Sequence, residues 1–164
     1  MEIILHEINA FYMFTGIIRH TGEIKEIRRA GDGKRFVIRA PQSILSQLET
    51  GITSIALDGS CHTVEQKSTD SFSVFSSWET LKRTTLDARK RGDSLNLELP
   101  LTPATLLDGH LVQGHVDGVG RVLSVKRKGE AFHYRFRAGR ELAVYLVEKD
   151  SIAIDGISLT LFDI

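Results

Sequence analysis

Apolar and polar residues alternate over short stretches of the chain, and turn-forming residues separate these stretches. Alternation with a period of two predicts half-buried strands over 23–29, 35–40, 71–77 and 95–99. The apolar stretch 14–19 is expected to be a further strand, followed by a turn at 20–22. Short strands at intervals of roughly 8–12 residues, without regular alternation with helices, favour a small β-barrel.

Two short helices are expected between these strands. Ile44, Leu45 and Leu48 have helical spacing and predict a helix over 43–48. Ser77 is a good N-cap, with Thr80 three residues later, so a second helix of about two turns is expected to begin there. Residues 140–147 repeat the apolar spacing of the first helix.

The strongest local signal is a hairpin pattern that occurs twice. The segment 54–64, SIALDGSCHTV, returns 97 residues later as 151–161, SIAIDGISLTL, and six of the eleven paired residues are identical. An Asp-Gly pair between apolar stretches is typical of a type I′ turn, because both residues tolerate a positive φ. Gly16 and Gly22 have counterparts in Gly114 and Gly120 at an offset of 98. A hairpin repeated at the length of a domain indicates an internally duplicated protein.

The predicted fold is therefore all-β, with two tandem, sequence-related six-stranded β-barrels and short helices. We expect an N-terminal extension over residues 1–12, a first barrel over 13–107 and a partial second barrel over 108–164. In the first copy 43 residues (65–107) follow the hairpin pattern, and in the second copy only three (162–164) follow it. The second barrel is expected to be truncated at the C-terminus, with an exposed edge.

Composition excludes several classes of protein. The 21 basic and 21 acidic residues balance, so no global charge favours binding to nucleic acid or to an anionic membrane. No apolar run approaches the roughly 18 residues that span a bilayer. The single cysteine, Cys61, cannot form an intramolecular disulfide or a CxxC metal site, and it suits a reducing cytoplasm.

Small polar side chains recur at matching places in the two hairpins. Cys61 and Thr63 share one face of a strand, as do Ser158 and Thr160, because residues two apart point the same way. Such pairs can hydrogen-bond a polyol or the edge of a heterocycle, although small hydroxyls on strands often simply face solvent. Both readings stay open at this point. His62 points away from Cys61 and is interpreted as a surface or interface residue.

The densest polar cluster is the segment 109–118, GHLVQGHVDG. Its histidines, His110 and His115, are five residues apart and face opposite sides of a strand-like stretch, which argues against a zinc site. The glycines suggest a close approach of the backbone to another group. The chain contains no HExxH, P-loop, GxGxxG or GxSxG motif, so no metal site is predicted.

In their order and spacing, these motifs resemble those of the riboflavin synthase family, whose members carry two lumazine-binding domains. The resemblance extends over 13–164. The matching stretches are MFTGII at 13–18, the first hairpin at 58–64, ETL at 79–81, GD and LNLE within 92–98, GHL and GHVDG within 109–118, and DGISLT at 155–160.

The resemblance implies a cytoplasmic transferase that uses no cofactor. Two molecules of 6,7-dimethyl-8-ribityllumazine would dismutate by four-carbon transfer into riboflavin and 5-amino-6-ribitylamino-pyrimidinedione. It also implies a homotrimer, if the C-terminal tail exists, and lumazine synthase as a further partner. The alternative is a non-catalytic lumazine or flavin carrier, or an inactive fragment.

The resemblance further implies functional roles for particular side chains. A histidine near neutral pH can assist proton loss from an acidic ring methyl, and two flat heterocycles must be stacked. The catalytic residues implied by position are Cys61, His115 and Ser158. The substrate-binding residues implied are Phe14, Ser54, Thr63, Thr80, Lys149, Asp155 and Thr160. One departure from the family lies beside them, because His62 stands where leucine is usual.

Overall fold

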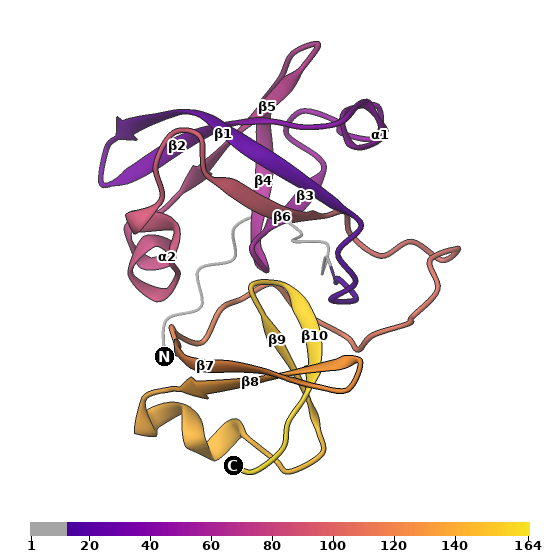
Figure 1. Cartoon of the computed structure of the whole chain (residues 1–164). Coiled ribbons are helices and arrows are strands. Elements are labelled where there is room, and N and C mark those ends of the chain that lie inside the picture. Colours follow the sequence, from indigo (N-terminus) through magenta and orange to yellow (C-terminus); the bar gives the residue numbers. More distant parts are fainter. Residues whose placement is uncertain (1–12) are drawn as a thin grey trace, which may run out of the picture.

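The first half of the chain forms a closed six-stranded antiparallel barrel (Figure 1). The computed structural model describes residues 13–164, so the extension expected over 1–12 lies outside the described residues. The strand order around the barrel is β1-β2-β5-β4-β3-β6. These strands are β1 (His20–Ala30), β2 (Gly33–Arg39), β3 (Ser54–Leu57), β4 (Ser60–Lys67), β5 (Ser71–Ser76) and β6 (Ser94–Glu98). The predicted all-β class is confirmed.

Short helices connect the strands of the barrel. In α1 (Gln42–Leu45) and the residues after it, Ile44, Leu45 and Leu48 are all buried, as their spacing predicts. Helix α2 (Trp78–Arg83) begins after Ser77, whose Oγ accepts a hydrogen bond from the amide of Thr80 at 3.3 Å. A 3₁₀ helix, η1 (Leu86–Ala88), follows α2. No helix within residues 13–164 is long and apolar enough to cross a membrane.

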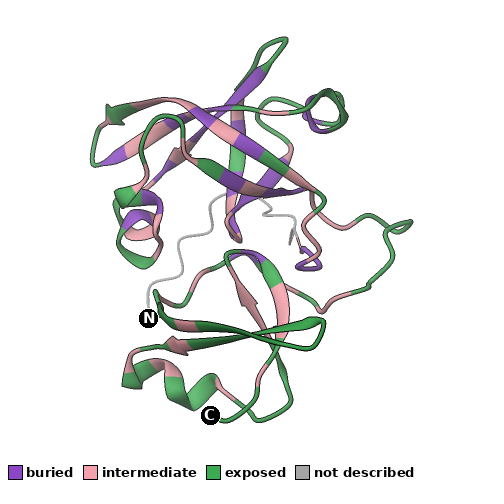
Figure 2. Cartoon of the chain, viewed as in Figure 1, coloured by how far each residue is buried: buried purple, intermediate pink, exposed green. Residues whose placement is uncertain are grey.

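The core lies inside this barrel, where alternate residues of each strand meet (Figure 2). Burying each large apolar side chain there stabilises the fold by roughly 1.5–3 kcal/mol. The largest fully buried side chains of the barrel interior are Ile24, Phe36, Ile38, Ile44, Leu48, Ile55, Leu57, Phe72, Leu86, Leu95 and Leu97.

The expectation of a strand over 14–19 with a turn at 20–22 was wrong. Strand β1 begins at His20, and Phe14 forms only an isolated bridge with Val112. Gly22 lies within β1, where a Cβ would come within 2.7 Å of Ile38 Cγ2 and 2.8 Å of Leu97 Cδ1. Glycine is therefore required by the close approach of neighbouring strands and not by a turn.

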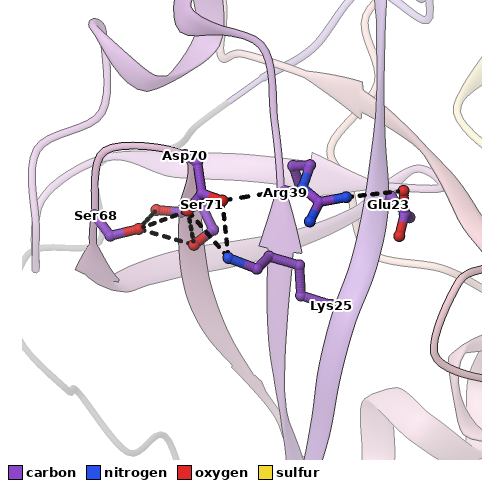
Figure 3. Close-up of polar contacts among 6 residues, drawn as sticks. All are labelled: Glu23, Lys25, Arg39, Ser68, Asp70 and Ser71. Carbon is purple, nitrogen blue, oxygen red and sulfur yellow. Dashed lines mark hydrogen bonds and ion pairs between the residues drawn. The ribbon is translucent and has the colours of Figure 1, made fainter.

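A polar cluster around Asp70 ties the β4–β5 turn to β1 and β2 (Figure 3). Asp70 accepts hydrogen bonds from Lys25 Nζ at 2.9 Å and from Ser71 Oγ at 3.0 Å. Arg39 Nε lies 3.9 Å from Asp70, and Arg39 also pairs with Glu23 at 3.3 Å. These side chains are largely exposed, so water screens the ion pairs and their contribution to stability is small.

The second half repeats the first four strands of the barrel as two separate two-stranded sheets. One contains β7 (Arg121–Lys128) and β8 (Ala131–Arg137), and the other contains β9 (Ser151–Ile154) and β10 (Ile157–Thr160). A 3₁₀ helix, η2 (Arg140–Tyr145), lies between them. The duplication extends to detail, since the bulge between Ile24 and Glu26 in β1 recurs between Val122 and Ser124 in β7.

The two sheets of the second half are separate because no described strand takes the places of β5 and β6. In the first barrel β5 joins β2 to β4, and β6 joins β1 to β3. Without such strands, side chains that correspond to core residues are exposed (Figure 2). The tandem arrangement is thus only partly visible. Examples are Val122 and Tyr134, the counterparts of the core residues Ile24 and Phe36, and Val125, the counterpart of Ile27, which packs against the core.

Candidate functional site

The two halves meet through the short segments that precede β1 and β7. We name residues 14–16 the first entry segment and residues 112–114 the second. Phe14 and Val112 exchange two backbone hydrogen bonds, of 2.7 and 3.0 Å. This bridge aligns the two entry segments side by side between the halves.

Each entry segment also bonds the hairpin of the opposite half. The amide of Cys61 donates to the carbonyl oxygen of Gly114 at 2.8 Å, and the amide of Ser158 donates to that of Gly16 at 2.8 Å. Cys61 and Ser158 are counterparts in the duplication, as are Gly16 and Gly114. The two bonds are therefore the same interaction made twice, with the halves exchanged.

The tips of the two hairpins touch each other. Asp58 and Asp155 each have φ 47°, and Gly59 and Gly156 have φ 81° and 79°, as a type I′ turn requires. A Cβ on Gly59 would lie 2.7 Å from the amide nitrogen of Gly156. The Asn96 side chain adds a hydrogen bond of 2.9 Å to the carbonyl oxygen of Asp155. Glycine is therefore needed both for the turn and for the contact between halves.

A buried carboxylate, Glu98, anchors the first entry segment. Its Oε1 accepts hydrogen bonds from the Thr15 amide at 2.7 Å and the Thr15 hydroxyl at 2.6 Å, and its Oε2 accepts one from the Gly16 amide at 3.1 Å. These three donors offset the free-energy cost of burying the carboxylate of Glu98, a residue that is only 9% exposed. Glu98 was not predicted as a site residue, and its signal in the sequence is a charged residue at the end of an apolar strand.

A pocket of about 180 Å³ opens where β4, α2 and the segment 114–116 meet. Three residues named from the sequence, Cys61, Thr80 and His115, lie together in its wall, although they come from a hairpin, a helix and the other half of the chain. Their roles stay predictions. The lining residues are Ser60, Cys61, Glu79, Thr80, Arg83, Thr84, Gly114, His115 and Val116.

The wall of this pocket is polar but its charges are internally paired. Arg83 Nε lies 2.5 Å from Glu79 Oε1, one helical turn away. Hydroxyl groups of Ser60, Thr80 and Thr84 supply neutral donors and acceptors around the pair. Such a wall suits an uncharged, polar heterocycle better than an ion.

Cys61 is present as a neutral thiol at neutral pH. Burial raises the pKa of the Cys61 thiol above its ordinary value, and a hydrogen bond with the Ser54 side chain opposes part of this shift. A thiolate is the nucleophilic form of cysteine, whereas a neutral thiol can act only as a weak hydrogen-bonding group. Ser54 itself is buried and reaches the pocket only through Cys61.

Phe14 and Thr63, which were also predicted to bind substrate, lie next to the pocket but do not line it. Phe14 is completely buried, and its ring lies 2.8 Å from where a Cβ on Gly114 would sit. Thr63 is exposed on the same strand face as Cys61, outside the lining of the pocket. The structure therefore brings Phe14 next to the site and leaves Thr63 on the surface beside it.

The residues named on the second hairpin lie away from this pocket. Ser158 Oγ is 2.8 Å from His110 Nδ1, and Asp155, Lys149 and Thr160 are exposed. By the duplication, the place of His115 is taken in the other half by an apolar residue, Ile17. The residue that follows the entry-segment glycine thus differs between the halves: it is His115 beside the first hairpin and Ile17 beside the second, whose Ser158 pairs instead with His110.

The interpretation of His62 as a surface or interface residue was wrong. His62 is 5% exposed, and burial lowers its pKa to about 4. It does point away from Cys61, as alternation predicts. That face, however, is the barrel interior and not solvent.

A larger open cleft, of about 520 Å³, lies over the outer face of β1 and β2. It contains none of the residues named from the sequence, and its lining is Lys25, Glu26, Ile27, Val37 and Arg91. Over the described part of the chain, no group of three or more His, Cys, Asp or Glu side chains is placed to hold a metal ion.

The amino-acid sequence is similar to a known protein family and to characterised members of it. Residues 15–100 and 113–164 match the family described as Lumazine binding domain. The riboflavin synthase of Photobacterium leiognathi is 42% identical over 149 residues, which cover 91% of this chain and 68% of that protein. The riboflavin synthase of Schizosaccharomyces pombe is 40% identical over 151 residues, covering 91% and 72%.

Solved structures show the same arrangement. LumP complexed with riboflavin superposes with a TM-score of 0.82 at 27% identity, covering 92% of this chain and 81% of that chain. LumP complexed with 6,7-dimethyl-8-(1′-D-ribityl) lumazine gives a TM-score of 0.80 at 26% identity, covering 92% and 80%.

Proposed function

The chain belongs to the lumazine-binding domain family, and we propose that it acts as a riboflavin synthase. The proposed reaction is the dismutation of two molecules of 6,7-dimethyl-8-ribityllumazine into riboflavin and 5-amino-6-ribitylamino-pyrimidinedione. The observation that carries this proposal is the 42% identity to a riboflavin synthase across 91% of the chain, since the match spans both halves and both hairpins.

The pocket is smaller than a complete small-molecule site, so under this proposal it encloses only part of a lumazine molecule. Pockets for small molecules usually measure roughly 300–1,000 Å³, and this one measures about 180 Å³. It would hold part of one heterocycle and leave a face of the ring open for a second molecule to stack. Holding two reactants in a productive stack supplies up to about 7–11 kcal/mol of barrier reduction.

The side chains in the pocket receive separate roles under this proposal. Cys61 and Thr80 hydrogen-bond the edge of the bound heterocycle, with Ser54 supporting Cys61 and Thr63 contacting the part that extends beyond the pocket. Phe14 packs behind the site. His115 exchanges the proton of the reacting methyl group, because an imidazole can accept and release protons near neutral pH.

The second hairpin is proposed to bind the other lumazine molecule. Lys149, Asp155, Ser158 and Thr160 form this second set, with Ser158 also assigned to catalysis. They do not line the pocket of their own chain, so we propose that they face the pocket of a neighbouring chain in a homotrimer. The domain division at 13–107 and 108–164, a cytoplasmic location and a partnership with lumazine synthase belong to the same proposal.

A lumazine or flavin carrier without catalysis is the second candidate. It is favoured by the similarity to LumP, whose complexes contain ribityllumazine and riboflavin. Incubation with dimethyl-ribityllumazine separates the two candidates. An enzyme accumulates riboflavin well beyond the protein concentration, as followed by absorbance. A carrier instead binds lumazine stoichiometrically and forms none.

A further inference from the structure

His62 joins two neighbouring strands from inside the barrel. Its Nδ1 lies 2.8 Å from the carbonyl oxygen of Ser60 in β4, and its Nε2 lies 2.7 Å from the Ser76 hydroxyl at the end of β5. A carbonyl oxygen can only accept, so Nδ1 carries the proton and donates. Nε2 therefore accepts from the Ser76 hydroxyl. Both ring nitrogens are satisfied in one fixed orientation.

Both partners of His62 are connected to the pocket, Ser60 as a lining residue and Ser76 through Ser77 and Thr80. Ser76 immediately precedes Ser77, the N-cap of α2, and Ser77 Oγ lies 3.1 Å from the hydroxyl of Thr80. Thr80 also lines the pocket. A continuous path of hydrogen bonds and covalent bonds thus connects the lining residue Ser60 through His62, Ser76 and Ser77 to the lining residue Thr80.

The duplication provides an internal comparison for this residue. The counterpart of His62 in the second half is Leu159, and the counterpart of Ser60 is Ile157. Leucine would fill an apolar barrel interior without the cost of burying a polar ring. The imidazole occurs in the half whose hairpin forms the pocket. Its presence is thus better explained by the two bonds it makes than by core packing.

We propose that His62 is a positioning residue of the pocket, which fixes the separation of β4 and α2 through Ser60 and Ser76. Its ring faces the barrel interior, so it acts on the ligand through these two partners. The inference rests on the proposed function, because the pocket is the one assigned to lumazine.

Lumazine affinity of full-chain variants tests this role. We expect His62→Leu and Ser76→Ala each to weaken binding of dimethyl-ribityllumazine about 2- to 10-fold, the range that one net hydrogen bond supplies. The double variant should bind lumazine as tightly as whichever single variant binds it less tightly, because both substitutions remove the same hydrogen bond between His62 and Ser76. His62→Gln, which retains an acceptor for the Ser76 hydroxyl, should recover part of the affinity.

A stability-matched control separates positioning from general loss of stability. Phe72→Leu changes a fully buried side chain on β5, four residues before Ser76, and should lower the melting temperature without changing lumazine affinity. If His62→Leu does not fold, the small truncation Ser76→Ala paired with Phe72→Leu provides the same comparison.

The inference and the proposed function fail in different ways. Wild-type affinity in both His62→Leu and Ser76→Ala, additive losses in the double variant, or an equal loss in Phe72→Leu would overturn the positioning role alone. A wild-type chain that binds no lumazine would overturn the proposed function, and the positioning role with it.

Discussion

The amide of Cys61 donates a 2.8 Å hydrogen bond to the carbonyl oxygen of Gly114, across the boundary between the two halves of the chain. Gly114 has φ 81°, and the next residue, His115, lines the same pocket as Cys61. This bond therefore places a histidine from the second half beside the hairpin of the first. The pocket is a property of the contact between the halves and not of either half alone.

Substitution of Gly114 should destabilise the folded chain. A Cβ in Gly114→Ala would meet Cys61 Cβ at 2.7 Å and Phe14 Cε2 at 2.8 Å. We expect a loss of about 2–4 kcal/mol in the free energy of unfolding, from the left-handed backbone and the overlap together. Urea denaturation measures this loss. The control is Gly129→Ala, which has φ 62° but no atom within 4 Å, and should lose only about 1–2 kcal/mol. Equal losses would contradict the close contact.

Glu98→Gln should loosen the first entry segment. An amide side chain offers one acceptor oxygen where the carboxylate offers two, so a donor of Thr15 or Gly16 would lose its partner. We expect a loss of roughly 1–3 kcal/mol in the free energy of unfolding and faster hydrogen exchange at both amides. Glu49→Gln, an exposed carboxylate, is the matched control. Unchanged exchange at Thr15 and Gly16 would count against Glu98 as the anchor.

Removal of the pocket side chains should separate binding from proton transfer. Cys61→Ala is expected to weaken lumazine binding about 2- to 10-fold, because it removes a hydrogen-bonding group. His115→Ala is expected to lower turnover about 100-fold or more, the usual worth of a general acid or base. His133→Ala, an exposed histidine on β8, is the control and should leave steady-state kinetics unchanged. Wild-type kinetics in both pocket variants would mean that the site lies elsewhere.

The burial of His62 predicts a specific acid dependence of stability. Its pKa is lowered to about 4 by burial, below the 6.5 expected in the unfolded chain. Above pH 6.5 the His62 ring is neutral in both the folded and the unfolded chain, so its contribution to the free energy of unfolding does not change with pH. As the pH falls from 6.5 to 4, the unfolded chain binds a proton that the folded chain does not, so stability falls by up to about 3 kcal/mol.

His62→Leu should abolish that part of the acid dependence. The difference in unfolding free energy between wild type and variant, measured by urea denaturation from pH 4 to pH 7, should change by about 3 kcal/mol in favour of the variant at low pH. Parallel pH profiles of the two proteins would contradict a buried, neutral imidazole.

Local features of this fold were predictable from the sequence because local chemistry determines them. Asp58-Gly59 and Asp155-Gly156 form hairpin turns with positive φ at both residues. Ser77 caps α2 through its own side chain. In each case the residue type itself satisfies the backbone, whatever surrounds it.

Features that depend on distant neighbours were not predictable in the same way. Gly22 is typical of a turn, but Ile38 and Leu97 approach it within a strand. The alternation of side chains along β4 places His62 and Cys61 on opposite faces of the strand. Which of the two faces lies inside is determined only when the barrel closes. The sequence named Cys61, Thr80 and His115 as site residues through family resemblance. The glycines of 109–118 indicated a close approach of the backbone without identifying its partner, which for Gly114 is Cys61. Nothing local indicates that Glu98 anchors the segment alongside.

Product stoichiometry tests the central claim most directly. The purified full chain is incubated with a large molar excess of 6,7-dimethyl-8-ribityllumazine, and substrate and both products are quantified over time by chromatography. The proposed dismutation predicts one riboflavin and one 5-amino-6-ribitylamino-pyrimidinedione for every two lumazine molecules consumed, over many turnovers. Stoichiometric binding of lumazine without any riboflavin would contradict it and identify the chain as a carrier.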